Sequence, residues 1–71
     1  MLSSGPYVIV APSGFVDYFI TESDSMNSSV FFAKRFRTAE DGRKHIQKLA
    51  LKTPAFLTGP NPLEVRYVGP R

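Results

Sequence analysis

The sequence predicts an α+β fold: a small antiparallel sheet of three to four strands with one helix packed on one face. Three observations predict it. Two β-branched and aromatic segments at the N-terminus are joined by a turn, an amphipathic helical segment follows Thr38, and a short alternating segment lies near the C-terminus. The expected order is β-β-(β)-α-β within a single domain of residues 1–71.

The stretch "PYVIVAPSGFVDYFITES" reads as two strands around a tight turn through Pro12 and Gly14. Tyr7 to Val10 forms the first strand. The second strand alternates, so its residues divide between two faces. We expect the helix to cover one face, formed by Val16, Tyr18 and Ile20. The opposite, outward face holds Phe15, Asp17, Phe19 and Thr21.

Residues 22–29, "ESDSMNSS", are polar and favour a mobile loop. The segment that follows, "VFFAKRF", fits two patterns. Alternation favours a strand from Val30 to about Ala33, whereas a helical turn would place Phe32 and Phe36 on one side. We predict the strand.

A helix is expected from Thr38 to about Lys52. Thr38 and Asp41 have the spacing of a capping box, and Pro54 ends the helical pattern. The predicted apolar stripe consists of Gly42, Ile46, Leu49 and Ala50. Glycine inside a helix costs about 1 kcal/mol relative to alanine, so we expect close packing of Gly42 against the sheet.

The last predicted strand is "LEVRYV", with Leu63, Val65 and Tyr67 on one face and Glu64 and Arg66 on the other. Residues 1–5 and 69–71 are expected to be loose tails. A chain of 71 residues closes one core, with a net stability of roughly 3–5 kcal/mol. It has no cysteine and one histidine, so neither a disulfide framework nor a metal or other cofactor is expected.

The longest apolar run is far short of the roughly 20 residues of a membrane span, so no membrane partner is expected. The N-terminus lacks the basic head of a secretory signal. A cytoplasmic location is therefore expected.

Charge is unevenly distributed along the chain, whose formal net charge is +3. Residues 1–33 carry no lysine or arginine, whereas residues 34–52 carry seven basic residues against Glu40 and Asp41. Such polarity matters for partners and association rates rather than for the fold.

The segments "YVIV", "SGFVDYFITES", "AKRFRTAEDGRKHI" and "LEVRYV" together resemble a group of small, mostly uncharacterised bacteriophage and prophage proteins. These proteins carry a YxI strand and an AKRFxTxE(D/E)AxxxI motif, from which Gly42 departs by replacing the usual alanine. The resemblance implies an origin and an architecture, and the host cytoplasm as location, but no mechanism.

Catalysis is not expected. His45 is the one imidazole, and no sequence motif supplies an orienting acid or a nucleophile for it. His45 is better explained as a residue bordering the core. Helix capping explains Glu40 and Asp41 better than a metal site does, because adjacent helix positions point about 100° apart.

Two surfaces are candidates for binding a partner. The first is basic and consists of Lys34, Arg35, Arg37, Arg43, Lys44 and Lys48. The second is apolar and consists of Phe15 and Phe19 on the outward face. Each has a structural alternative, since a helix needs a solvated side and the faces of the strand could be reversed.

We predict a small phage-type interaction protein that binds and modulates a host or phage protein, with an aromatic centre ringed by charge. The alternative is a small basic module that contacts nucleic-acid phosphates. The sequence leaves open whether the chain is a monomer or a homodimer.

Overall fold

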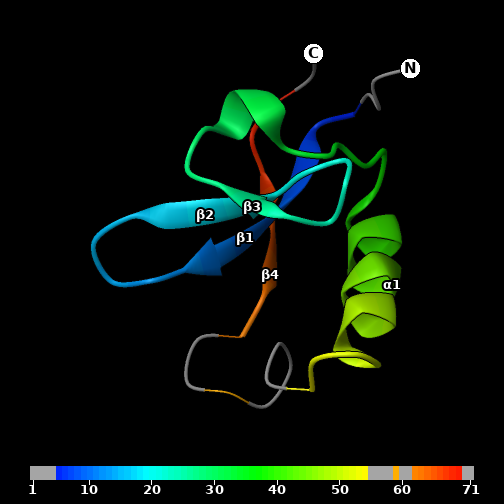
Figure 1. The fold of residues 1–71 in the computed structure, drawn as a ribbon. Coiled ribbons are helices and arrows are strands. Elements are labelled where there is room, and N and C mark those ends of the chain that lie inside the picture. Colours follow the sequence, from blue (N-terminus) through cyan, green and yellow to red (C-terminus); the bar gives the residue numbers. More distant parts are fainter. Residues whose placement is uncertain (1–4, 55–58, 60–61, 70–71) are drawn as a thin grey trace.

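The computed structural model describes residues 5–54, 59 and 62–69 and shows an α+β fold (Figure 1). Its elements are strands β1 (Tyr7–Pro12), β2 (Asp17–Ile20), β3 (Met26–Asn27) and β4 (Glu64–Tyr67), the 3-10 helix η1 (Val30–Phe32) and the helix α1 (Ala39–Ala50). The strands form one antiparallel sheet in the order β3-β2-β1-β4, and α1 packs against it. The predicted fold class is confirmed.

The β1–β2 hairpin differs from the predicted one in where it turns. β1 continues through Pro12, which pairs with Asp17, so the connection consists of residues 13–16. Gly14 lies there with a φ of 93°, a left-handed conformation that glycine adopts without a steric cost. β2 consequently begins two residues later than the predicted strand, and Phe15 and Val16 belong to the turn.

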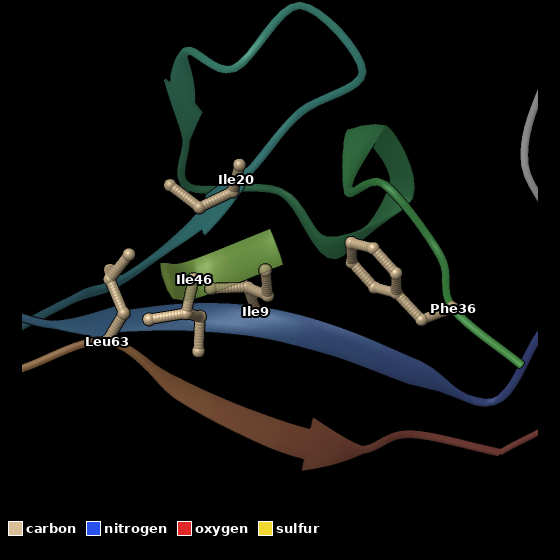
Figure 2. Packing of buried hydrophobic residues seen from close by; sticks show 5 residues of the cluster. All are labelled: Ile9, Ile20, Phe36, Ile46 and Leu63. Carbon is tan, nitrogen blue, oxygen red and sulfur yellow. The ribbon is translucent and has the colours of Figure 1, made fainter. Parts of the chain in front are cut away.

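The main core lies between the sheet and α1 (Figure 2). It is formed by Ile9, Ile20, Phe36, Ile46 and Leu63. Ile20 therefore faces the helix as predicted. Val16 and Tyr18 remain 44% and 39% exposed, so the helix covers the Ile20 end of the predicted face and leaves its turn end open to solvent.

Helix α1 begins where the sequence predicts. The Thr38 hydroxyl accepts a hydrogen bond of 3.1 Å from the Asp41 amide, which satisfies one of the unpaired amides of the first turn. Gly42, Ile46 and Ala50 are buried and Leu49 is half-buried, so the predicted stripe is confirmed. A Cβ on Gly42 would lie 2.9 Å from Val65 Cγ2 and 3.2 Å from Val65 Cγ1, which explains the glycine as a point of close packing on β4.

A second apolar cluster lies on the opposite face of the sheet. It consists of Val8, Val10, Phe19 and Ala33. The prediction that Phe19 lies on an exposed outward face is wrong, because only 8% of Phe19 is exposed. Among the described residues no second α-helix covers this face. Ala33 packs into the cluster there, and the position of Arg66 opposite Val8 places its side chain on the same face.

The segment from 22 to 36 contains more structure than predicted. The expected loop includes the edge strand β3, whose Met26 and Asn27 pair with Ile20 and Phe19. A turn closed by a 2.9 Å bond from the Thr21 amide to the Ser25 carbonyl precedes it. The predicted strand at Val30 to Ala33 is wrong, since Val30–Phe32 forms η1.

The extended chain comes instead at residues 33–36. Ala33 forms a bridge with Thr21 of the chain after β2, and Phe36 forms a bridge with Tyr7 of β1. These residues thus fill the space where β1 and β2 diverge, and Phe36 enters the main core as an anchor. The alternating pattern did not predict this position of the extended chain, because the segment pairs in a gap between β1 and β2 that its own residues do not specify.

The two predicted tails lie mostly outside the described residues. Their inner ends are held together by Arg35, whose Nη1 donates 3.1 Å hydrogen bonds to the carbonyls of Gly5 and Gly69.

Candidate functional site

The 3-10 helix η1 presents apolar side chains to solvent. Phe31 is 66% exposed and Phe32 is 60% exposed, and Val30 beside them is partly exposed. We call Val30, Phe31 and Phe32 the aromatic turn. The two rings contact each other edge to face, with centroids 5.9 Å apart. An exposed aromatic pair of this kind is a typical feature of a binding surface.

Hydrogen bonds hold the backbone of the aromatic turn in one conformation. The Ser29 amide donates to Asn27 Oδ1 at 2.8 Å, and Ser29 Oγ accepts from the Phe31 amide at 3.2 Å. The Ala33 amide closes the turn on the Val30 carbonyl at 3.1 Å. Ala33 is itself buried, so the turn is anchored at both ends to the sheet.

The chain that links η1 to α1 (Figure 1) contains three basic residues. We call Lys34, Arg35 and Arg37 the basic connector. Lys34 is half-buried, with its Nζ 5.8 Å from the centre of the Phe36 ring, and Arg37 is exposed. Arg35 has a structural role, because its guanidinium is directed at the carbonyls of Gly5 and Gly69.

The helix cations are exposed but do not form one surface. Arg43 borders an open groove between α1 and β4. Lys44 and Lys48 are four residues apart and share a side of the helix that is turned away from the sheet. Within the described part of the chain, none of these three cations forms an ion pair.

The predicted apolar patch of Phe15 and Phe19 is not formed. Phe19 is buried, and Phe15 is fully exposed at the tip of the β1–β2 hairpin. That tip projects away from α1 (Figure 1), so Phe15 is far from the helix cations. Phe31 and Phe32 are instead followed directly along the chain by the first half of the predicted basic set.

Two polar contacts tie the elements together. His45 Nε2 and Asp24 Oδ1 are 2.8 Å apart, and the imidazole is 5.5 Å from the Phe36 ring, so His45 borders the core as expected. Arg66 Nη1 donates to Asp17 Oδ2 at 2.8 Å, and Arg66 Nη2 donates to Glu64 Oε1 at 2.9 Å. Hydrogen bonds from Asp17 and then Glu64 raise the pKa of Arg66 above its usual value.

Among residues 5–54, 59 and 62–69, no group of three or more acidic, histidine or cysteine side chains is placed to hold a metal ion. In the same part of the chain, no helix is long and apolar enough to cross a membrane.

Sequence reasoning missed the aromatic turn because it assigned Val30 to Ala33 to a strand. A signal was present. Two adjacent phenylalanines in a strand point to opposite faces, yet no polar residue alternates with them. Asn27 and Ser29 immediately before them are the residue types that start short helical turns.

Comparisons of the chain with protein-family models, with curated proteins and with solved structures give no match. The resemblance to phage and prophage proteins therefore stays a prediction.

Proposed function

We propose that this chain is a small non-catalytic interaction protein that binds an acidic protein surface through the aromatic turn, with Lys34 and Arg37 beside it. The observation that carries the proposal is the exposure of Phe31 and Phe32 on a backbone that is already fixed. Because the turn is ordered before binding, less conformational entropy is lost when a partner covers the rings.

The chemistry of the partner is argued from charge. Phe31 and Phe32 provide the apolar centre that a binding surface needs, and Lys34 and Arg37 follow them within five residues along the chain. Neither Lys34 nor Arg37 forms an ion pair within the described residues, so both are available to carboxylates of a partner. A host or phage protein is the partner that the sequence resemblance suggests, and binding would modulate its activity.

The alternative partner is a nucleic acid, since exposed aromatic rings beside cations also suit base stacking. It is less well supported. A phosphate backbone is bound by cations that lie along one line on the surface, whereas the six predicted cations face in different directions. Arg35 is directed inward, Arg43 borders β4, and Lys44 and Lys48 face away from the sheet.

The proposal is tested by affinity capture from host lysate with matched variants of the bait. Phe31→Ser/Phe32→Ser changes the aromatic turn, whereas Phe15→Ser changes a fully exposed phenylalanine on a different turn. We expect an acidic protein that is retained by the wild type and by Phe15→Ser and is lost from the double variant. Charge reversal by Lys34→Glu and Arg37→Glu should weaken the same capture.

Retention that is indifferent to both sets of changes would refute the proposed surface. Titration of short single-stranded DNA and RNA separates the alternative. Phosphate binding would weaken steeply between about 50 and 200 mM salt, and each removed cation contact would flatten that dependence. Binding of this kind, lost with Lys44 and Lys48, would favour the nucleic-acid module instead.

A further inference from the structure

Strand β4 lies at one edge of the sheet. Among the described residues its single strand neighbour is β1, with the register Tyr7↔Tyr67, Val8↔Arg66, Ile9↔Val65 and Val10↔Glu64. The Val68 amide donates to the Pro6 carbonyl at 2.7 Å. Antiparallel pairs alternate along a ladder, so Arg66 and Glu64 also direct their backbone groups to β1. The amides and carbonyls of Val65 and Tyr67 therefore point outward, away from the sheet.

Edge strands are usually protected from pairing by charges or by proline. The charges of β4 would instead favour pairing with one particular partner, a second copy of the same strand. The order in "LEVRY" is apolar, acidic, apolar, basic, apolar, which is complementary to itself when the strand is reversed. Antiparallel pairing of two β4 strands centred on Val65 puts Glu64 of one copy opposite Arg66 of the other, twice. Leu63 then lies opposite Tyr67 of the other copy.

This register is selected over its neighbours. Only residues with outward-pointing backbone groups can exchange hydrogen bonds across the edge. In a symmetric pair the two-fold axis must therefore pass through a residue and not between two residues. Centring the pair on Glu64 would set two carboxylates against each other, and centring it on Arg66 would set two guanidinium groups against each other. Like charges directly opposite in a sheet are destabilising, whereas opposite charges stabilise.

We propose that β4 is a homodimerisation strand, and that two copies of this chain join their sheets edge to edge about a two-fold axis through Val65. A second copy is the occupant because the strand is complementary in charge to itself. Glu64 and Arg66 pair with each other within one copy at 2.9 Å, and Arg66 also holds Asp17. Their side chains are still 52% and 41% exposed, so both can also reach the second copy.

A groove borders β4 on the side of the helix. Beyond the contact of Gly42 with Val65, an open groove of about 290 Å³ lies between α1 and β4. Arg43 and Gln47 on the helix side and Leu63, Glu64 and Val65 on the strand side line it, with Ile46 at its base in the main core. In the dimer these side chains would border the joined strands.

The first test is the mass of the wild-type chain in solution, measured by sedimentation equilibrium. We expect a monomer–dimer equilibrium. Hydrogen exchange adds a local readout, because the amides of Val65 and Tyr67 should be protected only in the dimer. A chain that stays monomeric at the concentrations used for NMR would overturn the proposal.

Charge reversal tests the register. Glu64→Arg opposes two cations at each of the two pairs, and we expect dimerisation roughly tenfold to hundredfold weaker. Arg66→Glu opposes two carboxylates and should act alike. A mixture of the two variants restores complementary charges at every pair, so heterodimers should form where neither variant dimerises alone. Failure of the mixture to associate while both variants are folded would refute this register.

Matched controls carry the same charge change away from β4: Glu40→Arg and Lys48→Glu lie on exposed positions of α1 and should leave the dimer unchanged. Arg66 also holds Asp17, so Arg66→Glu is checked by thermal unfolding. Should it be unfolded, Glu64→Arg alone still decides. Salt screens the repulsion between cations in the Glu64→Arg dimer and the attraction between opposite charges in the wild-type dimer. Raising the salt concentration should therefore strengthen the Glu64→Arg dimer and weaken the wild-type dimer. An unchanged response to salt in both proteins would overturn the proposal.

Discussion

The two faces of the sheet are closed in different ways. The face with Ile9 and Ile20 is covered by α1, a regular element whose buried residues recur with the period of a helix. The face with Val8 and Val10 has no α-helix over it among the described residues: Ala33 packs into its cluster, and Arg66 on the same face bonds Asp17. Both valines are nonetheless completely buried, as is Ile9. Regular structure is thus one of two ways in which this small domain excludes water from its sheet.

The comparison implies that both faces contribute to stability, and Phe19→Ala is its most demanding test. Removing the buried ring should cost about 3–5 kcal/mol, which equals the whole stability expected for a domain of this size. We expect the variant to be unfolded at room temperature by circular dichroism. The milder Phe19→Leu should remain folded and lose roughly 1 kcal/mol in urea denaturation.

Phe15→Ala is the matched control for Phe19. The two phenylalanines are four residues apart and were assigned to one face by alternation, yet Phe15 is fully exposed. Its replacement should change the free energy of unfolding by less than about 0.5 kcal/mol. Equal losses at the two positions would contradict the second apolar cluster.

The helix face is tested by Gly42→Ala, which should be the next largest effect. Alanine favours the helix by up to about 1 kcal/mol, but its Cβ would meet both γ-methyls of Val65. Rotation of Val65 replaces one methyl by the other, so overpacking should win, with a net loss of about 1–2 kcal/mol.

A double-mutant cycle with Val65→Ala checks the cause of that loss. Shortening Val65 makes room for the new methyl, so Gly42→Ala should cost less in that background than in the wild type. Additive losses would show that the two residues do not meet, and a stabilised single variant would show that propensity outweighs packing.

The sequence predicts the helix-covered face of the sheet better than the opposite face. The capped helix after Thr38 and the strand around Val65 are specified by local patterns, and both are observed. The alternation that placed Ile20 under the helix was also correct. The cover of the opposite face left no periodic signal, because Ala33 is brought there by a bridge to Thr21 rather than by its own neighbours.

The same gap explains the outcome for the candidate site. Phe19 was assigned to the surface because nothing in the sequence showed what would cover it. The exposed pair, Phe31 and Phe32, was assigned to a strand because an apolar run fits both a buried strand and an exposed turn. Arg35 looked like a surface cation, and only the meeting of Gly5 with Gly69 gives it an internal role.

Helix α1, which covers the first face of the sheet, also depends on its capping residue, Thr38. Thr38→Ala removes the acceptor of the Asp41 amide and should destabilise the protein by about 1 kcal/mol. Thr38→Ser keeps a hydroxyl at the same position and is the control, with a loss that should be much smaller. Urea denaturation of the three proteins measures the difference, and equal stability of the alanine and serine variants would mean that the cap contributes nothing.

Arg66 contributes to stability on the opposite face of the sheet, and we expect its replacement to have the smallest effect on the free energy of unfolding. Arg66→Met keeps an unbranched stem beside Val8 and removes the bonds to Asp17 and Glu64. Exposed pairs of this kind contribute little, so the loss should be about 0.5 kcal/mol. Because salt screens the charges, raising the salt concentration in urea denaturation should narrow the difference between wild type and variant. No loss at any salt concentration would assign the role of Arg66 to packing of its stem, which methionine retains, and the second face would then be closed by apolar contact alone.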